Sequence, residues 1–199
     1  MRVLAIAALS LALSAGAALG QTAAWTDTQG RLTFQHPTGW PVDIPSGQSA
    51  SLFQVIAGTA DEECKFFVAP RDTAARTPDA VRRGVLTPIG DAAWSSTASS
   101  LRIFRDALFT VSNARVDTSG FWPVQRATLT SGSDVVQAAL QARPGAEYWA
   151  FCQTYNGSDR TAVFEQVTAS MGSPRDAEWR TAIEAAQAAA AATTPPPQQ

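Results

Sequence analysis

The sequence predicts an α+β domain built on one largely antiparallel β-sheet with helices packed against it. Four segments with strand-like patterns, residues 108–117, 121–130, 134–142 and 146–155, follow one another on short turns. Strands joined in this way form an antiparallel meander. Three earlier strand-like segments, residues 31–36, 50–57 and 63–69, and several helical segments flank the meander, as is typical of α+β folds.

The stretch at residues 146–171 is the organising unit of this prediction. Its first part alternates, but both sets of side chains are apolar: Tyr148, Ala150 and Cys152 on one side, and Trp149, Phe151 and Tyr155 on the other. A strand with one face in water carries polar residues on that face, so this strand is expected in the middle of the sheet with both faces covered. Asn156-Gly157 then predicts a turn.

The remaining strands are shorter and are interrupted by turn residues. Residues 24–30 are expected to be a polar lead-in without a strand, and residues 31–36 alternate as a half-buried strand. Residues 40–44 predict a short return strand, and residues 58–62 predict a hairpin connection.

Helix starts are marked by capping residues. Thr77-Pro78 and Ser173-Pro174 each place a hydroxyl cap before a proline, which suits the first turn of a helix. Asp91 is expected to cap a second helix. Ser158 or Asp159 is expected to cap a helix whose apolar stripe follows three- and four-residue steps: Val163, Phe164, Val167 and Met171.

The two ends of the chain differ from the middle. Residues 1–20 combine a positive start, a short apolar run and small residues, which predicts a signal peptide cleaved between Gly20 and Gln21. The residue directly after the cleavage site is Gln21 and not a cysteine, so we expect no lipid anchor. Residues 21–190 are expected to form one domain. Residues 191–199 are rich in proline and glutamine and are expected to be a disordered tail.

The charge and composition indicate in which compartment the protein is expected and which classes of partner it can bind. The formal net charge is −2, without the basic footprint that nucleic-acid binding requires. Lys65 is the only lysine among 15 Lys and Arg residues, a bias that fits a GC-rich bacterial genome. An exported bacterial chain would be periplasmic or secreted, with no stable membrane anchor.

The two cysteines suit an exported protein. Disulfides form and persist in oxidising compartments, so Cys64 and Cys152 are predicted to be bridged. The bond would close a loop of roughly ninety residues, and two buried free thiols are the alternative.

The sequence contains no recognisable catalytic constellation. His36 is the only histidine, and no G-x-S-x-G motif accompanies it. One histidine and two distant cysteines do not make a zinc site, and no phosphate-binding glycine motif occurs, so we expect neither a metal nor a cofactor. Asp61, Glu62 and Glu63 are expected to form a solvated turn. The D-[ST]-G-like Asp117-Thr118-Ser119-Gly120 is expected to be a plain turn.

A few residues are candidates for a binding groove. Trp40 and Trp122 lie beside prolines, where side chains are often half exposed, although packing in the core is the alternative for both. Arg115, Arg126 and Arg143 lie on or beside neighbouring strands and would meet an anionic ligand if they converged. Solvated sheet edges are the alternative.

Two parts of the chain resemble a known superfamily. Residues 34–42, FQHPTGWPV, are similar to the F-x-x-P-x-G-W-x-V opening of PsbP-like domains and of the related LpqN- and DcrB-type bacterial envelope proteins. The strand at residues 148–152, followed by a turn and a helix that ends in Ala169-Ser170-Met171, resembles the closing strand and helix of that group. The resemblance implies an α-β-α sandwich around an antiparallel sheet and a non-catalytic accessory or binding role, and it brings no catalytic residues.

These observations favour a soluble periplasmic, non-enzymatic accessory or binding protein of the bacterial cell envelope. Its partner would be another envelope protein or a small ligand. A hydrolase of unrecognised type and a secreted protein-interaction factor are the alternatives. A cleft with convergent titratable groups of perturbed pKa would favour an enzyme.

Overall fold

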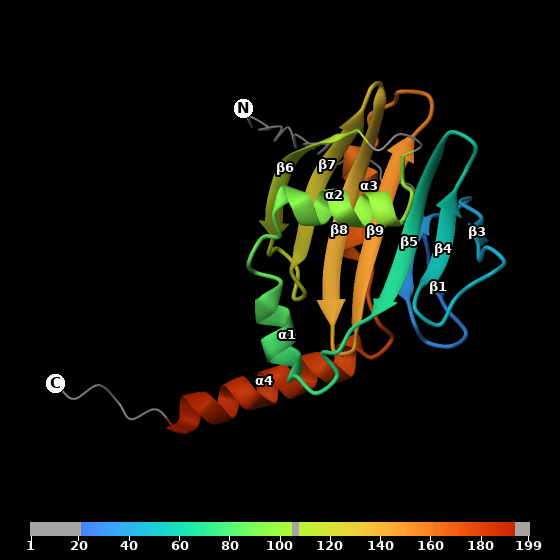
Figure 1. Cartoon of the computed structure of the whole chain (residues 1–199). Coiled ribbons are helices and arrows are strands. Elements are labelled where there is room, and N and C mark those ends of the chain that lie inside the picture. Colours follow the sequence, from blue (N-terminus) through green and yellow to red (C-terminus); the bar gives the residue numbers. More distant parts are fainter. Residues whose placement is uncertain (1–20, 105–107, 194–199) are drawn as a thin grey trace, which may run out of the picture.

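The computed structural model of the protein describes residues 21–104 and 108–193. Its centre is a seven-stranded sheet in which every neighbouring pair is antiparallel (Figure 1). The strand order across the sheet is β3 (Val42–Asp43), β4 (Phe53–Gly58), β5 (Glu62–Pro70), β9 (Ala146–Thr154), β8 (Asp134–Arg143), β7 (Val124–Ser131) and β6 (Thr110–Asp117). The predicted α+β class and the four-strand meander are thus confirmed.

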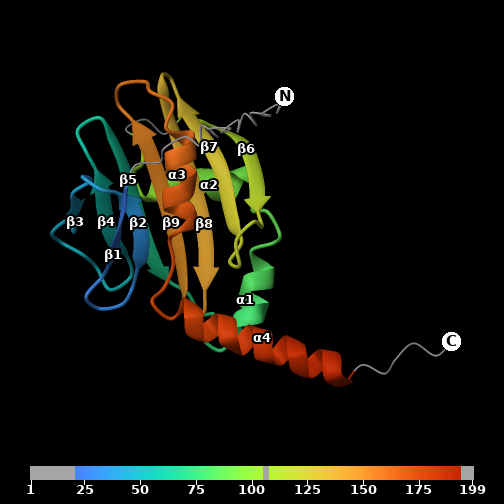
Figure 2. The ribbon, with the colours of Figure 1, turned by 180° about the vertical axis from the view of Figure 1, so that it is seen from behind.

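Helices cover both faces of this sheet. Figure 1 shows α2 (Asp91–Ser100) lying across one face, and Figure 2 shows α3 (Thr161–Ala169) on the opposite face. α1 (Pro78–Gly84) and α4 (Asp176–Thr193) meet at the lower end of the sheet. The arrangement is the predicted α-β-α sandwich.

β9 lies in the middle of the sheet because both of its faces are apolar. Tyr148, Ala150 and Cys152 belong to the core between the sheet and α3, together with Phe164 and Val167 of that helix. On the other face, Trp149 and Phe151 pack with Trp94 and Ala98 of α2. The period-two pattern of β9 therefore assigned these side chains to the correct layers, whereas Tyr155, which was grouped with Trp149 and Phe151, is 57% exposed.

The disulfide lies at the junction between the two halves of the sheet. Cys64 of β5 and Cys152 of β9 are direct cross-strand partners, they are bonded, and both are completely buried. β3, β4 and β5 come from the first half of the chain, whereas the meander comes from the second half. The bond therefore fastens two segments that the chain itself connects only through α1, α2 and most of the meander.

Helix α1 begins as its sequence predicts. Thr77 is the N-cap, its hydroxyl accepts a hydrogen bond from the backbone N–H of Ala80, and Pro78 follows in the first turn. The other three capping predictions are wrong in detail, and α4 begins at Asp176 instead of directly after Ser173. Gly90 and Arg160 are the N-cap residues of α2 and α3 and make no side-chain cap; Asp91 and Thr161 are already helical, and Asp159 Oδ1 accepts from the N–H of Thr161.

The N-terminal strands pair differently from the expectation. The lead-in forms a strand, β1 (Thr22–Thr26), which pairs with β2 (Thr33–Pro37) in a separate two-stranded sheet. β3 turns away from β2 and pairs with β4. The hairpin is held against the core because Phe34 stacks on Phe66 of β5, with ring centroids 4.2 Å apart.

The predicted boundaries at the chain ends meet the structure only in part. The expected signal peptide at residues 1–20 lies outside the described residues. α4 extends to Thr193, so it includes three residues that were expected to be in the disordered tail. The rest of that tail lies outside the described residues. No helix in the described ranges combines the length and the apolar character that crossing a bilayer requires.

Candidate functional site

The candidate site lies where two central strands part at the upper end of the sheet. β8 begins at Asp134, but its pairing with β9 starts only at Val136, opposite Gln153. β9 continues to Thr154, which is still paired with Glu62 of β5. Val135 and Thr154 lie at this end of the ladder and line an opening in the protein surface.

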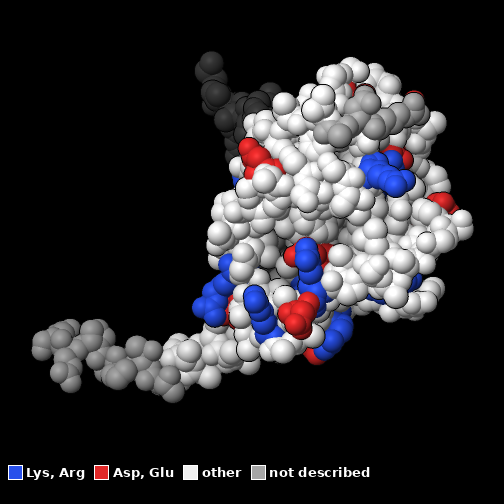
Figure 3. Space-filling view, viewed as in Figure 1, with Lys and Arg blue, Asp and Glu red and all other residues white. Residues whose placement is uncertain are grey.

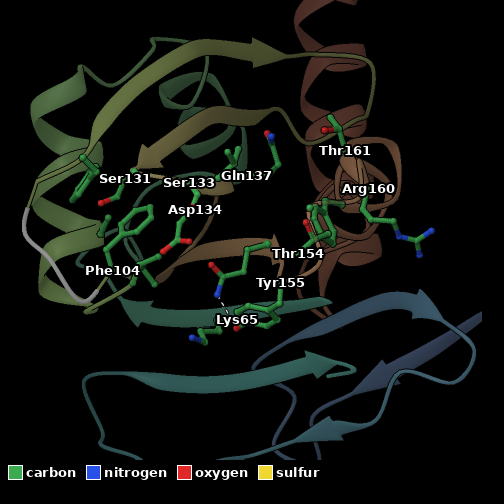
Figure 4. A pocket seen from close by; sticks show the side chains of 18 of the residues that line it. Lys65, Phe104, Ser131, Ser133, Asp134, Gln137, Thr154, Tyr155, Arg160 and Thr161 are labelled. Carbon is green, nitrogen blue, oxygen red and sulfur yellow. Dashed lines mark hydrogen bonds between the residues drawn. The ribbon is translucent and has the colours of Figure 1, made fainter. Parts of the chain in front are cut away.

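A cavity of about 1340 Å³ occupies this opening, and we call it the end cavity. Its walls come from the end of α2 with residues 102–104, from Phe109, from the β7–β8 turn, from the end of β9 with its loop to α3, and from Lys65 of β5. Figure 4 shows Lys65 and Tyr155 together on one side, Phe104, Ser131 and Asp134 on a second side, and Arg160 and Thr161 on a third. A smaller cavity of about 420 Å³ adjoins it, because Gln137 and Thr161 line both.

The wall of the end cavity combines apolar and polar groups. Phe104 and Phe109 stack with ring centroids 5.0 Å apart. Val135 and Tyr155 also line the cavity and are 47% and 57% exposed, respectively. Large apolar side chains that remain exposed around a concave surface are typical of ligand sites, where a few polar groups fix the orientation of the ligand.

A hydrogen-bonded network stands at the rim beside β5. Glu63 accepts hydrogen bonds from the Tyr155 hydroxyl and from Gln153, and it forms an ion pair with Lys65 at 2.9 Å. Burial raises the pKa of Glu63, but the hydrogen bonds from Tyr155 and Lys65 outweigh it, and the net pKa lies below the ordinary value. Burial, the hydrogen bond to Glu63, and the charges of Glu63 and Asp134 raise the pKa of Tyr155 to about 12.

Strained backbone also marks these cavities. Two non-glycine residues in the described part of the chain have positive φ: Arg102 at 52° and Asn113 at 53°. Arg102 lines the end cavity and Asn113 lines the smaller one. Residues in this region of backbone space cluster at ligand sites more often than elsewhere, because the surrounding fold must hold them there.

The structure does not bring the two predicted groove tryptophans together. Trp40 is 5% exposed within the core on the α3 face, and its Nε1 donates to Glu62 at 3.0 Å. Trp122 is 8% exposed and packs against Trp179 and Ile183 of α4. Both side chains are thus packing residues, which was the alternative, and neither lines the end cavity.

Two of the predicted arginines do lie together. Arg115 and Arg126 are cross-strand partners of β6 and β7, and both contact α3. Arg115 pairs with Glu165 and lines the smaller cavity. Arg126 is buried and donates to Asp117, to Thr168 and to the Glu165 carbonyl, so its hydrogen-bonding groups are already occupied.

Arg143, the third arginine, is the deepest of the group at 1% exposed. It donates to both carboxylate oxygens of Asp176, at 2.7 and 2.8 Å, and its guanidinium lies 4.2 Å from the centre of the Trp122 ring. It joins β8 to the first turn of α4. The three arginines therefore tie helices to the sheet instead of converging on one anion.

The remaining sequence candidates have structural partners. His36 is buried, and its Nδ1 lies 3.0 Å from the Pro37 carbonyl oxygen. Asp117 accepts from the N–H and hydroxyl of Ser119, which makes its segment a turn as predicted. Within residues 21–104 and 108–193, no three His, Cys, Asp or Glu side chains gather closely enough to hold a metal ion.

The acidic run, expected to be a solvated turn, instead takes part in packing. Glu62 accepts from Arg160 of the cavity wall and from Trp40, and Glu63 forms the rim network. The sequence reasoning missed Arg102 and Tyr155 as cavity residues. Tyr155 carried a signal, because it is an aromatic residue directly before an Asn-Gly turn, where a strand leaves the core.

The matches to known proteins are structural ones. No protein-family model matches the chain, and no curated protein matches it. Among solved structures, the chain is similar to the solution structure of cyanobacterial PsbP (CyanoP) from Synechocystis, at 15% sequence identity and a TM-score of 0.48. That alignment covers 82% of this chain and 98% of the other. A likeness of this degree assigns neither a ligand nor an activity to the chain.

Proposed function

We propose that the protein is a soluble, exported, non-enzymatic binding protein of the bacterial cell envelope, and that the end cavity is its binding site. The observation that carries this proposal is a cavity of about 1340 Å³ at the upper end of β8 and β9, with the exposed side chains of Val135 and Tyr155 in its wall. A concave surface that exposes apolar groups beside a few polar ones is typical of a ligand site.

The export part of the proposal is supported from two directions. Residues 1–20 have the pattern of a secretory signal, and Cys64 and Cys152 are placed as a bonded cross-strand pair in the core. Bonds of this kind persist in oxidising compartments.

The acid–base groups at the cavity rim favour binding over catalysis. A general acid or base works best with a pKa near the operating pH. Here the pKa of Glu63 is lowered and that of Tyr155 is raised to about 12, so at neutral pH the carboxylate stays ionised and the phenol stays protonated. Each group stabilises the charge state of the other, which suits a fixed rim of hydrogen-bond donors and acceptors.

The proposal is tested by native mass spectrometry of the full chain exported to an oxidising periplasm. The probe is the fraction below about 1 kDa of a bacterial periplasmic extract, a size that suits the cavity. Val135→Trp places a large ring in the cavity wall, and Ile44→Trp is the matched control because Ile44 is 44% exposed and does not line the cavity.

We expect wild type and Ile44→Trp to retain the same bound compound and Val135→Trp to lose it. Retention by all three proteins would contradict the assignment of the site. Absence of any bound compound, together with turnover of a chromogenic ester or peptide substrate, would contradict the non-enzymatic function and support the hydrolase.

A further inference from the structure

We propose that the ligand of the end cavity is a short peptide with apolar side chains and free termini, whose carboxylate binds Arg102 and whose ammonium group binds Asp134. This inference rests on the proposed function, because it names the chemistry of the ligand at the same site. Three features of the cavity lead to it: a cation and an anion that pair with no side chain in the described part of the protein, and apolar walls.

Arg102 is held in a conformation that arginine seldom adopts. It follows the C-cap of α2, where its N–H donates to the Ser99 carbonyl and the N–H of Ile103 donates to the Ala98 carbonyl. This is the Schellman arrangement, whose left-handed position is usually glycine. An arginine here costs stability that a glycine would spare, so its side chain is expected to serve another purpose.

The guanidinium of Arg102 is available to a ligand. It lines the end cavity, it is exposed, and it forms no side-chain hydrogen bond or ion pair with the residues that the structure describes. The other two cations of the wall differ, because Lys65 pairs with Glu63 and Arg160 pairs with Glu62. A guanidinium that pairs with no described side chain matches the fork geometry of a carboxylate.

Asp134 supplies the opposite charge. It stands at the start of β8, it is exposed, and it too has no ion pair among the described residues, although its charge is felt by Tyr155. Arg102 and Asp134 line one cavity without pairing with each other. A purely anionic ligand would meet Asp134, and a purely cationic one would meet Arg102, so a ligand that carries both charges suits the pair best.

The rest of the wall suits a peptide between these charges. Phe104, Phe109 and Val135 offer apolar surface to the side chains of a peptide. Figure 3 shows that charged side chains gather over α1 and α4, whereas the middle of this face, over α2, is mostly uncharged.

The test pairs blocked peptides with two variants by isothermal titration calorimetry. The probes are Leu-Leu-Leu, its N-acetyl form and its C-terminal amide; an extended tripeptide spans roughly 10 Å. Arg102→Gly removes the guanidinium and supplies the residue preferred at that position, and Asp134→Asn keeps the shape of its side chain. Arg76→Gly is the control, because Arg76 is exposed, has no described side-chain partner and does not line the cavity.

We expect Arg102→Gly to weaken binding of the free tripeptide about tenfold and to leave binding of the amide unchanged. Asp134→Asn should weaken binding of the free tripeptide and leave the acetylated form unchanged. Arg102→Gly should also melt about 2–4 °C higher than wild type, because glycine relieves the left-handed residue. If Arg102→Gly gains thermal stability and loses affinity for the tripeptide, the role of Arg102 is in binding and not in stabilising the fold.

Equal affinity of wild type and Arg102→Gly for the free tripeptide, or equal losses for the free and amidated forms, would overturn the inference. So would the absence of binding by any of the three peptides. If Val135→Trp still loses the compound retained from the periplasmic extract, only the peptide class fails and the proposed function stands.

Discussion

Removal of the Cys64–Cys152 bond is expected to lower stability by about 3 kcal/mol. The bonded residues are 88 apart in sequence. The chain-entropy relation gives roughly 4.6 kcal/mol at 25 °C for a loop of that length, and measured effects usually fall to about 2–4 kcal/mol. Because the bond joins β5 to β9, it restricts the unfolded chain across most of the sheet. A loss of about 3 kcal/mol lowers Tm by about 6–12 °C in a protein of this size.

Alanine is the appropriate replacement, because both sulfur atoms lie in a fully buried layer where serine would bury a hydroxyl. Cys64→Ala, Cys152→Ala and the double variant should show similar urea midpoints without reductant, since each lacks the same bond. Wild type refolded with dithiothreitol should approach the variants, and the double variant should be indifferent to the reductant. Losses that simply add in the double variant, or a reductant-insensitive wild type, would refute the reasoning.

Two further predictions concern the rim network and the attachment of α4. In an absorbance titration at 295 nm, Tyr155 should ionise near pH 12, above the ordinary 10, and Tyr155→Phe should remove that step; a transition at pH 10 would contradict the network. Because the pKa of Glu63 is lowered in the folded state, its contribution is present above its ordinary pKa of 4.5 and is lost below it. The stability deficit of Tyr155→Phe should therefore shrink in acid, and a deficit independent of pH would speak against the Glu63 contact. Gly172→Ala should cost about 1–3 kcal/mol in urea unfolding, because the new Cβ would clash with Asp176 where it binds Arg143; Gly84→Ala, with open space around its Cα, should cost no stability.

The elements that were predicted correctly from the sequence are those whose signals lie within a few neighbouring residues. The two apolar faces of β9 assigned it to the middle of the sheet, and Thr77-Pro78 fixed the start of α1. The short turns between successive strands were sufficient to predict the order of the strands in the meander. Each of these features depends on residues within a few positions of one another, where periodicity and capping are reliable guides.

The features that were not predicted depend on contacts between residues far apart in the sequence. β1 has Trp25 as its only large apolar residue, so no clear alternation marks it as a strand, and it pairs with β2 beside it. In the sequence, Arg126 and Arg143 resembled solvated residues at a sheet edge. Both are buried, because Arg126 donates a hydrogen bond to Thr168 of α3 and Arg143 forms an ion pair with Asp176 of α4.

The end cavity was equally hidden from sequence reasoning. The strand patterns of β8 and β9 continue to Asp134 and Thr154, so no local signal in the sequence predicts a cavity beside these residues. The left-handed conformation of Arg102 could not be predicted either, because glycine is the residue that usually marks this position after a helix, and here the residue is arginine.

Hydrogen–deuterium exchange of wild type, with and without the fraction below about 1 kDa of periplasmic extract, tests most directly whether the opening between β8 and β9 is the binding site. We predict slower exchange at residues 131–135 and 153–160 when the fraction is present, and no change in Val135→Trp. Protection confined to the outer strand β6 or to α4, with residues 131–135 and 153–160 unchanged, would contradict the assignment.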